Sequence, residues 1–306
     1  MQRLEGENNR IFIAAYGLQD EFTPDVPLTE ITLTCNPHYR YGGKKSEEEL
    51  ERLLKADTMR EFISYAVGCM FGRYSLDKPG LILANQGETV EDYLRIVGAG
   101  DSSLPMVARN DRFLPDKDNV IPILDGDWFT DDIVARFGRF LRVTFGDEHY
   151  AENLAFIEAA LGRDLRSFFV REFYDDHLKR YQRRPIYWLF SSSGGSFNAL
   201  VYMHRYQPDT VSVVLNDYLR EYQAKLTAAR SDALHNSIAA GASNREKAAA
   251  LKEVSRLDKV LKELAEYEAV LLDLARKQVQ IDLDDGVKVN YAKFGGALRR
   301  VVGLNA

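Results

Sequence analysis

Apolar residues recur at helical spacing through the middle of the chain, between residues 127 and 180. Positions three and four apart lie on one face of an α-helix, so this spacing predicts helices that bury one side. One stripe comprises Ile133, Phe137, Phe140 and Leu141, and a second comprises Leu154, Ile157, Leu161, Leu165 and Phe169. The second stripe is interrupted near Gly162, where we expect one helix to end and another to begin.

A longer apolar pattern occupies residues 209–238 and 245–279, which are joined by the small-residue segment 239–244. Its two seams are Val211, Leu215, Tyr218, Tyr222, Leu226 and Ala229, and Val254, Leu257, Leu261, Leu264, Leu271 and Leu274. Two near-heptad seams with a short connection predict an antiparallel, coiled-coil-like helical arm over residues 209–279. Pairing about a turn near residue 241 would place Leu257 opposite about residue 225.

Residues 185–206 have the pattern of an aromatic β-hairpin. Apolar and β-branched residues fill both of its strands, and the segment SSSGGS at 191–196 supplies the turn. Trp188 and Phe190 fall on one face, where Phe197 and Val201 of the second strand can meet them. We therefore expect the hairpin to belong to the core.

The first part of the chain has a mixed pattern. Residues 8–20 predict a helix, residues 28–35 alternate as a strand does, and Ser46 caps a long helix with acidic residues in its first turn. Residues 81–83 are a short strand candidate, and residues 98–120 have a loop-like composition.

These patterns predict an α+β fold that is mostly helical. We expect two parts: a mixed α/β region over residues 1–125, and a helical region over residues 126–306 that contains the hairpin and the arm.

The composition is that of an ordinary globular protein, with 306 residues, 45% hydrophobic and 28% charged. The net charge is −6, so the chain as a whole is not a basic nucleic-acid binder, and any DNA contact requires a local patch. Cys35 and Cys69 are the only cysteines, which fits a reducing, cytoplasmic location. No apolar run approaches the roughly 18 residues of a membrane span, and no signal peptide is readable, so we expect no membrane association.

Two basic groups are candidates for phosphate contact. The larger group flanks the hairpin and comprises Lys179, Arg180, Arg183, Arg184 and Arg205, interleaved with Tyr181, Tyr187 and Tyr206. The smaller group comprises Arg40, Lys44 and Lys45, beside Tyr41 and a Gly-Gly pair. Arginine and aromatic side chains together suit DNA backbone binding and base stacking. The alternative is a solvated helix end, because cations near a helix C-terminus complement its dipole.

Other motifs favour structural roles. Asn36-Pro37-His38-Tyr39 is close to the Asn/Asp-Pro-Pro-Tyr/Phe loop in which adenine-N6 methyltransferases hold a flipped base, but His38 replaces the second proline. No glycine-rich cofactor loop precedes it, so a turn capped by Asn and Pro is favoured. The Ser/Gly segment 191–196 could cradle a phosphate but lacks the lysine of a P-loop. Residues 282–286 depart from a calcium loop, and the five histidines have no ligand spacing, so no metal is expected.

Several long strings resemble the PglX family of adenine-specific DNA methyltransferases of BREX phage-defence systems. The strings are RRPIYWLFSSSGGSFNALVYMHRY, NRIFIAAYGLQDEFTPDVPLTEITLTCNPHYRYG, ISYAVGCMFGRYSLDKPGLILANQGETVEDYL, FLPDKDNVIPILDGDWFTDDIV and IDLDDGVKVNYAKF. They cover roughly residues 8 to 295 in colinear order. The resemblance implies that the chain corresponds to the C-terminal part of such a protein, beyond its methyltransferase core.

On that resemblance, the parent protein transfers a methyl group from S-adenosylmethionine to adenine in host DNA. This chain would carry no catalytic residue and no cofactor of its own, and it would contact DNA, the N-terminal methyltransferase core or other BREX proteins. The alternative hypothesis is a protein–protein scaffold without a DNA role, favoured by the acidic net charge and the helical arm.

Overall fold

The computed structural model describes residues 1–98 and 112–304, so part of the expected loop 98–120 lies outside the described residues. The chain divides into two compact units, Met1–Phe62 and Ile63–Ala306. The boundary between the units lies inside the long helix α3, Glu47–Met70. The boundary expected near residue 125 falls inside the second unit, because residues 120–122 pair with the hairpin.

The first unit begins with helix α1 (Gln2–Tyr16), which ends at Gly17 in the left-handed conformation with φ 69°. The helix predicted at residues 8–20 is thus present but begins and ends earlier. Its polar side faces the chain that follows, since the Gln2 amide donates to Val26 O at 2.8 Å and Glu5 accepts from the Thr32 amide at 3.1 Å. Its apolar residues, among them Leu4, Ile11 and Phe12, are exposed.

The strand predicted at residues 28–35 is wrong. Leu28–Glu30 form a 3-10 turn, and Asn36 closes the segment by donating its side-chain amide to Leu28 O at 3.0 Å and Ile31 O at 2.8 Å. No strand of the first unit, residues 1–62, is available as a partner for it. The short helix α2 (Pro37–Tyr41) follows directly.

Helix α3 begins as predicted. The Ser46 hydroxyl accepts a hydrogen bond from the Glu49 amide at 3.2 Å, and Glu47, Glu48 and Glu49 fill the first turn. Acidic side chains there are stabilised by the positive end of the helix dipole. The C-terminal part of α3 brings Ile63, Ala66, Val67 and Met70 into the core of the second unit, where each is fully buried.

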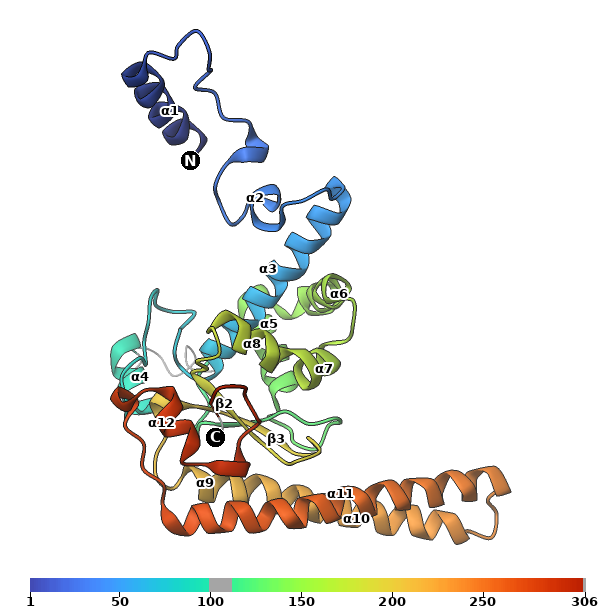
Figure 1. Ribbon diagram of the computed structural model, residues 1–306. Coiled ribbons are helices and arrows are strands. Elements are labelled where there is room, and N and C mark those ends of the chain that lie inside the picture. The colour runs from blue at the N-terminus through green and yellow to red at the C-terminus, as the bar shows by residue number, and fades with distance from the viewer. Residues whose placement is uncertain (99–111, 305–306) are drawn as a thin grey trace. The chain divides into compact units, whose positions relative to one another are not determined.

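The core of the second unit is a three-stranded antiparallel sheet of β1 (Val120–Pro122), β2 (Tyr187–Ser191) and β3 (Asn198–Tyr202), in the order β1-β3-β2 (Figure 1). The hairpin is confirmed, and Trp188 pairs with Val201 as expected. Phe197 lies just beyond the paired strands, with its ring 6.1 Å from that of Tyr267. Every residue of β2 and β3 is buried, because helices and loops cover the sheet.

The strand expected at residues 81–83 is absent, although Ile82 and Leu83 are buried as expected. Their amides donate to Arg73 O at 2.9 Å and Gly72 O at 3.1 Å. This contact is too short to form a ladder.

Several short helices surround the sheet in the second unit. They are α4 (Val90–Val97), α5 (Ile133–Phe145), α6 (Tyr150–Leu161), α7 (Leu165–Phe168), a π-helical segment (Phe169–Phe173), α8 (Tyr174–Arg180) and α12 (Val287–Ala292). The helical pattern predicted over residues 127–180 is confirmed, and Gly162 ends α6 with φ 71°. The apolar stripe is buried through Ile133, Phe137, Phe140 and Leu141.

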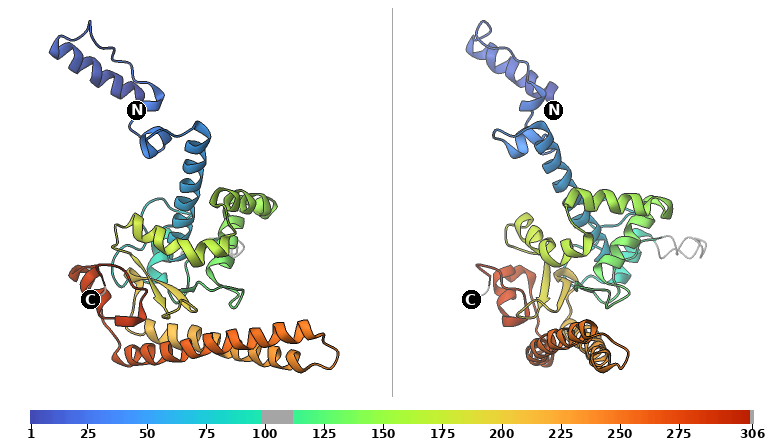
Figure 2. Two further views of the ribbon diagram at one scale, coloured as in Figure 1. Left: turned by 45° about the vertical axis from the view of Figure 1, so that its right-hand side comes forward. Right: turned by 90° about the vertical axis from the view of Figure 1, so that its right-hand side faces the viewer.

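The predicted arm is also present. It comprises α9 (Thr210–Val213), a π-helical segment (Val214–Leu219), α10 (Arg220–Ile238) and α11 (Asn244–Lys277). Figure 2 shows α10 and α11 side by side and extending past the sheet of the same unit. Ser243 caps α11 by accepting from the Glu246 amide at 3.3 Å, and Glu246 accepts from the Ser243 amide in return.

The pairing of the two arm helices differs from the prediction. Arg230 pairs with Asp258 and Arg220 with Glu268, so Leu257 lies beside residues near 230 and not near 225. The reversal is therefore closer to the start of α11 than to residue 241. Leu257 is buried in the seam, while Leu261 is only half-buried.

Candidate nucleic-acid interface

The larger basic group is centred on the turn after α8. Gln182 and Arg183 have left-handed backbones, with φ 49° and 60°, and the Arg183 amide donates to Leu178 O at 2.7 Å. This reversal separates α8 from β2. The side chains of Lys179, Arg183 and Arg184 are exposed, and none of them has an ion pair within the described part of the chain.

Arg180 lies beside them but is partly neutralised. Its guanidinium pairs with the Asp176 carboxylate one helical turn away at 2.6 Å, and both side chains are less than a quarter exposed. The three cations with accessible, uncompensated charge are therefore Lys179, Arg183 and Arg184.

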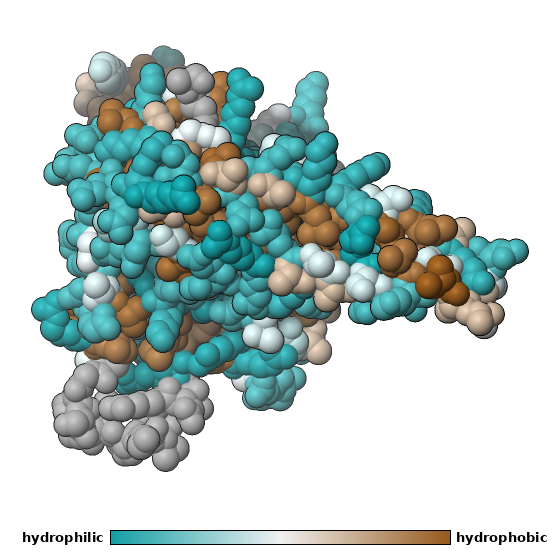
Figure 3. Space-filling view, turned by 90° about the horizontal axis from the view of Figure 1, so that it is seen from below, coloured by the Kyte–Doolittle hydropathy of each residue, from teal (hydrophilic) through white to brown (hydrophobic). Residues whose placement is uncertain are grey.

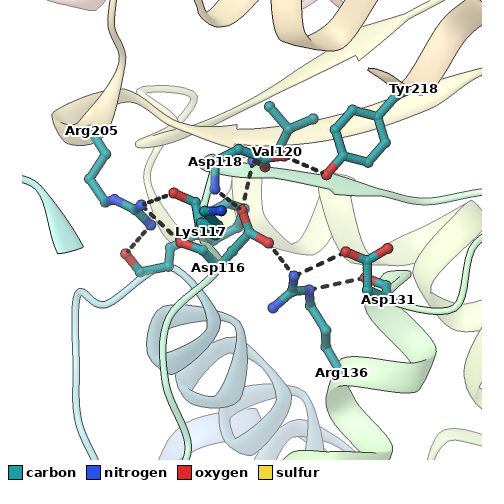
Figure 4. Close-up of polar contacts among 9 residues, drawn as sticks. Asp116, Lys117, Asp118, Val120, Asp131, Arg136, Arg205 and Tyr218 are labelled. Atoms are coloured by element: carbon teal, nitrogen blue, oxygen red, sulfur yellow. Dashed lines mark hydrogen bonds and ion pairs between the residues drawn. The ribbon is translucent and has the colours of Figure 1, made fainter. Parts of the chain in front are cut away.

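Arg205 is in the interior, with 6% of its surface exposed. Its guanidinium donates to Asp116 O at 2.9 Å, to Phe71 O at 3.3 Å and to Lys117 O at 3.4 Å (Figure 4). The residue joins the end of the hairpin to two other segments of the core. A guanidinium held by three carbonyl groups in the interior cannot reach a phosphate without unfolding this region.

Figure 4 shows that Arg205 lies beside a cluster of charged groups that includes Asp116 and Arg136. Asp116 forms an ion pair with Arg136 and accepts a hydrogen bond from the Val120 amide at 3.1 Å. Asp118 accepts from the Tyr218 hydroxyl at 2.9 Å, and burial together with the neighbouring Asp116 raises its pKa to about 6. These bonds fix the start of β1 against α5 and the arm, which is a structural role.

The interleaved tyrosines do not form an exposed stacking surface. Tyr187 is 2% exposed and Tyr206 is 4% exposed. Tyr181 is half-buried, with its ring 4.6 Å from that of His177. Base stacking on this group would need aromatic faces open to solvent, so the geometry favours phosphate contact alone.

The smaller basic group lies in the first unit and is mostly committed to local contacts. Arg40 pairs with Glu61 at 2.8 Å and with Asp57 at 3.3 Å. Lys45 donates to Gly42 O at 3.2 Å and so caps the end of α2. Lys44 is exposed and has no ion pair among the described residues.

Asn36 has the capping role that the sequence favoured. Its side chain accepts from the His38 amide at 3.2 Å, and Pro37 occupies the first turn of α2. Because its amide also donates to carbonyl groups of residues 28–31, both ends of the side chain are occupied. Asn36 therefore has no free group with which to hold a base.

The Ser/Gly turn of the hairpin holds an anion from the protein itself. Glu263 of α11 accepts from the Gly194 amide at 2.8 Å, the Ser196 amide at 3.3 Å and the Ser196 hydroxyl at 2.6 Å. Burial alone would raise the pKa of Glu263, but the hydrogen bonds from Ser192, Ser196 and Gly194 outweigh it and lower the pKa. This contact ties the arm to the sheet. The sequence did not predict this contact, because 67 residues separate Ser196 from Glu263. A single glutamate on an amphipathic helix is also not distinguished by sequence from one that faces solvent.

No group of three or more His, Cys, Asp or Glu side chains able to hold a metal ion occurs among residues 1–98 and 112–304. The segment 282–286 is a turn, in which Asp282 accepts from the Asp284 amide at 3.0 Å. Within the same described residues, no helix combines the length and apolar character needed to cross a membrane.

Comparison with known proteins gives a consistent result, although no protein-family model matches the chain. The chain is 37% identical over 317 residues to the adenine-specific methyltransferase BrxX of Escherichia coli O9:H4 (strain HS). The matched region covers 97% of the chain and 25% of that protein. It is also 37% identical over 304 residues to the adenine-specific methyltransferase PglX of Lacticaseibacillus casei (strain Zhang). That match covers 94% of the chain and 22% of the relative.

The chain therefore spans about a quarter of the length of the relatives it matches. The resemblance to PglX is confirmed: nearly the whole chain is similar to part of each of the adenine-specific methyltransferases BrxX and PglX.

Proposed function

We propose that this chain is the C-terminal, non-catalytic region of a BREX adenine-N6 DNA methyltransferase, and that it contacts DNA through the phosphate backbone. The similarity to BrxX and PglX supports the methyltransferase context. The observation that carries the DNA contact is the exposure of Lys179, Arg183 and Arg184 at the end of α8 and the turn after it, with no ion pair to any of them among the described residues.

The residues that contact DNA in this proposal are fewer than the sequence suggested. Lys179, Arg183 and Arg184 form the contact, and Lys44 is a separate candidate in the first unit. Arg180, Arg40 and Lys45 take part only if they exchange their present partners, and Arg205 supports the fold. Phosphate contacts position a protein on DNA without reading its sequence, so target choice belongs to other parts of the methyltransferase.

Catalysis belongs to the remainder of the parent protein in this proposal. S-adenosylmethionine would bind there, and the same remainder is the first candidate partner of this chain. We expect the chain alone to bind no S-adenosylmethionine, because Asn36 is committed to capping and no glycine-rich cofactor loop is present in the sequence.

The proposal is tested with the double variant Arg183→Ala with Arg184→Ala, in DNA-binding assays by fluorescence anisotropy at low salt. Each lost charge-assisted contact should cost about 1.5 kcal/mol or more, so we expect at least about a hundredfold loss of affinity for the pair. The matched control is Arg245→Ala with Lys252→Ala, which removes two exposed cations from the arm.

An unchanged DNA affinity in Arg183→Ala with Arg184→Ala would contradict a specific contact at the turn after α8. An equal loss of affinity in this variant and in the control variant would contradict it as well. Circular dichroism should show that both variants remain folded, since all four side chains are exposed.

A second candidate function is docking of a protein partner by the arm. Figure 3 shows apolar surface along the arm, where Leu234, Ile238 and Leu251 are 41%, 72% and 52% exposed. Exposed apolar patches mark interaction sites more often than isolated apolar residues do. Binding that resists high salt and is lost in Ile238→Asp would favour this function, because apolar docking does not release counterions.

A further inference from the structure

An open pocket of about 830 Å³ lies between the Ser/Gly turn and the segment that follows α12. That segment runs beside β2, since the Arg299 amide donates to Leu189 O at 2.8 Å and Leu298 forms a bridge with Phe190. The pocket is therefore built on the edge of the sheet. Its volume is within the range of about 300–1,000 Å³ that is typical of small-molecule sites.

The pocket is basic although the chain is acidic. Arg299 and Arg300 belong to its wall, and none of the described lining residues is an aspartate or glutamate. The Arg299 guanidinium is oriented by the Asp175 carboxylate at 2.9 and 3.1 Å. Arg300 is exposed and has no ion pair among the described residues. One arginine is thus held in place and the other is free to bind an anion.

The turn on the opposite wall already holds one anion. Its Gly194 and Ser196 amides donate to the Glu263 carboxylate, and the Gly195 amide donates to Ser192 O, so these N–H groups are taken. Ser193, which is exposed, adds a hydroxyl group to the same wall of the pocket.

Gly296 lines the pocket. A Cβ atom placed on it would meet no heavy atom within 4 Å, and its backbone is outside the region that L-residues avoid. Neither close packing nor backbone conformation therefore requires glycine here. A larger side chain at this lining position would meet no close contact at its Cβ.

We propose that this pocket binds a phosphate group carried by a nucleotide or by the end of a nucleic-acid strand. Arg300 would make the charge-assisted contact, and the Ser193 hydroxyl would donate from the opposite wall. The site shares no residue with the group Lys179, Arg183 and Arg184, so it goes beyond the proposed DNA contact and stands or fails separately.

The test is isothermal titration of the full chain with three probes: adenosine 5′-monophosphate, a 5′-phosphorylated single-stranded oligonucleotide, and inorganic phosphate as competitor. We expect binding of at least one organic probe, with competition by phosphate. Binding of the mononucleotide identifies a nucleotide site. Binding of the oligonucleotide alone identifies a strand end when Arg300→Gln weakens it, because the proposed DNA contact after α8 would bind the same probe.

Gly296→Leu should fill the pocket and weaken binding by at least about tenfold, and Arg300→Gln should weaken it by about tenfold. Arg245→Gln, an equal change of charge at an exposed position of the arm, should leave the affinity within about twofold. The proposal is overturned if neither organic probe binds, or if Arg300→Gln binds as the unaltered chain does. Because Arg300 is exposed, that variant remains informative even if Gly296→Leu fails to fold.

Discussion

At the scale of single residues, position in the fold decides which candidate side chains can act. Arg183 and Arg205 flank the same hairpin and are both arginines, yet one is exposed at a left-handed turn and the other is 6% exposed among carbonyl groups. A sequence pattern places both at the hairpin ends. Only the long-range contacts of Arg205 with Phe71 and Asp116 separate their roles.

Trp188 should be a principal contributor to stability. Its side chain is fully buried, its ring centroid is 5.0 Å from that of Tyr291, and its indole N–H donates to Pro185 O at 3.0 Å. Trp188→Ala should therefore lower the free energy of unfolding by about 3–5 kcal/mol in denaturant titration. The matched control is Trp128→Ala, which should lower the free energy of unfolding by less because Trp128 is only partly buried. Equal losses would show that the hairpin is not the centre of the core.

His177 should make the fold sensitive to acid. Burial, followed by the charges of Arg180 and Arg73, lowers its pKa to about 3, from an ordinary value of 6.5. As pH falls below about 6.5 the unfolded chain gains a proton that the folded chain does not, so stability is full above that pH and is lost toward pH 3.

The comparison variant is His177→Gln, which cannot be protonated and can still accept the Tyr187 amide bond that His177 accepts at 3.3 Å. Between pH 6 and 4 the unfolding free energy of the unaltered chain should fall more steeply, by up to about 1.4 kcal/mol per pH unit. Parallel pH curves for the two proteins would rule out a neutral, buried His177.

At the scale of elements, the arm and the hairpin were readable because each carries its own periodicity. The near-heptad seams predicted two helices, and alternation with a Ser/Gly turn predicted β2 and β3. The two incorrect strands, at residues 28–35 and 81–83, were short runs with an alternating or apolar pattern. Neither run pairs with a strand in the part of the chain that the structure describes. A strand depends on its neighbour, whereas a helix satisfies its own backbone, and this explains the difference in success.

The arm should be stable without any partner. Leu257 is 1% exposed in the seam between α10 and α11, so Leu257→Asp would bury an unpaired carboxylate. We expect circular dichroism to show loss of helix, and limited proteolysis to begin near residues 239–243, where the two helices are joined. Leu251→Asp is the control, because Leu251 is 52% exposed. If Leu257→Asp leaves helix content and protease resistance unchanged, the seam between the two helices is wrong.

At the scale of the whole molecule, a net charge of −6 predicts that any DNA contact is limited to local patches. The resemblance to PglX was visible in colinear strings and extends over nearly all of the chain. The Glu263 contact and the basic pocket were not predictable, because both join segments far apart in sequence. No periodicity or short motif encodes such contacts.

The most direct test of the central claim is the salt dependence of DNA affinity. A protein that contacts phosphates releases counterions, so the logarithm of the affinity falls with the logarithm of salt concentration by about 0.9 per phosphate contact. Contacts by Lys179, Arg183 and Arg184 predict a slope of about −2.7 for the unaltered chain. In Arg183→Ala with Arg184→Ala two of the three contacts are lost, so the magnitude of the slope should fall by about 1.8. A slope near zero, or one that the double variant does not change, would contradict the DNA contact.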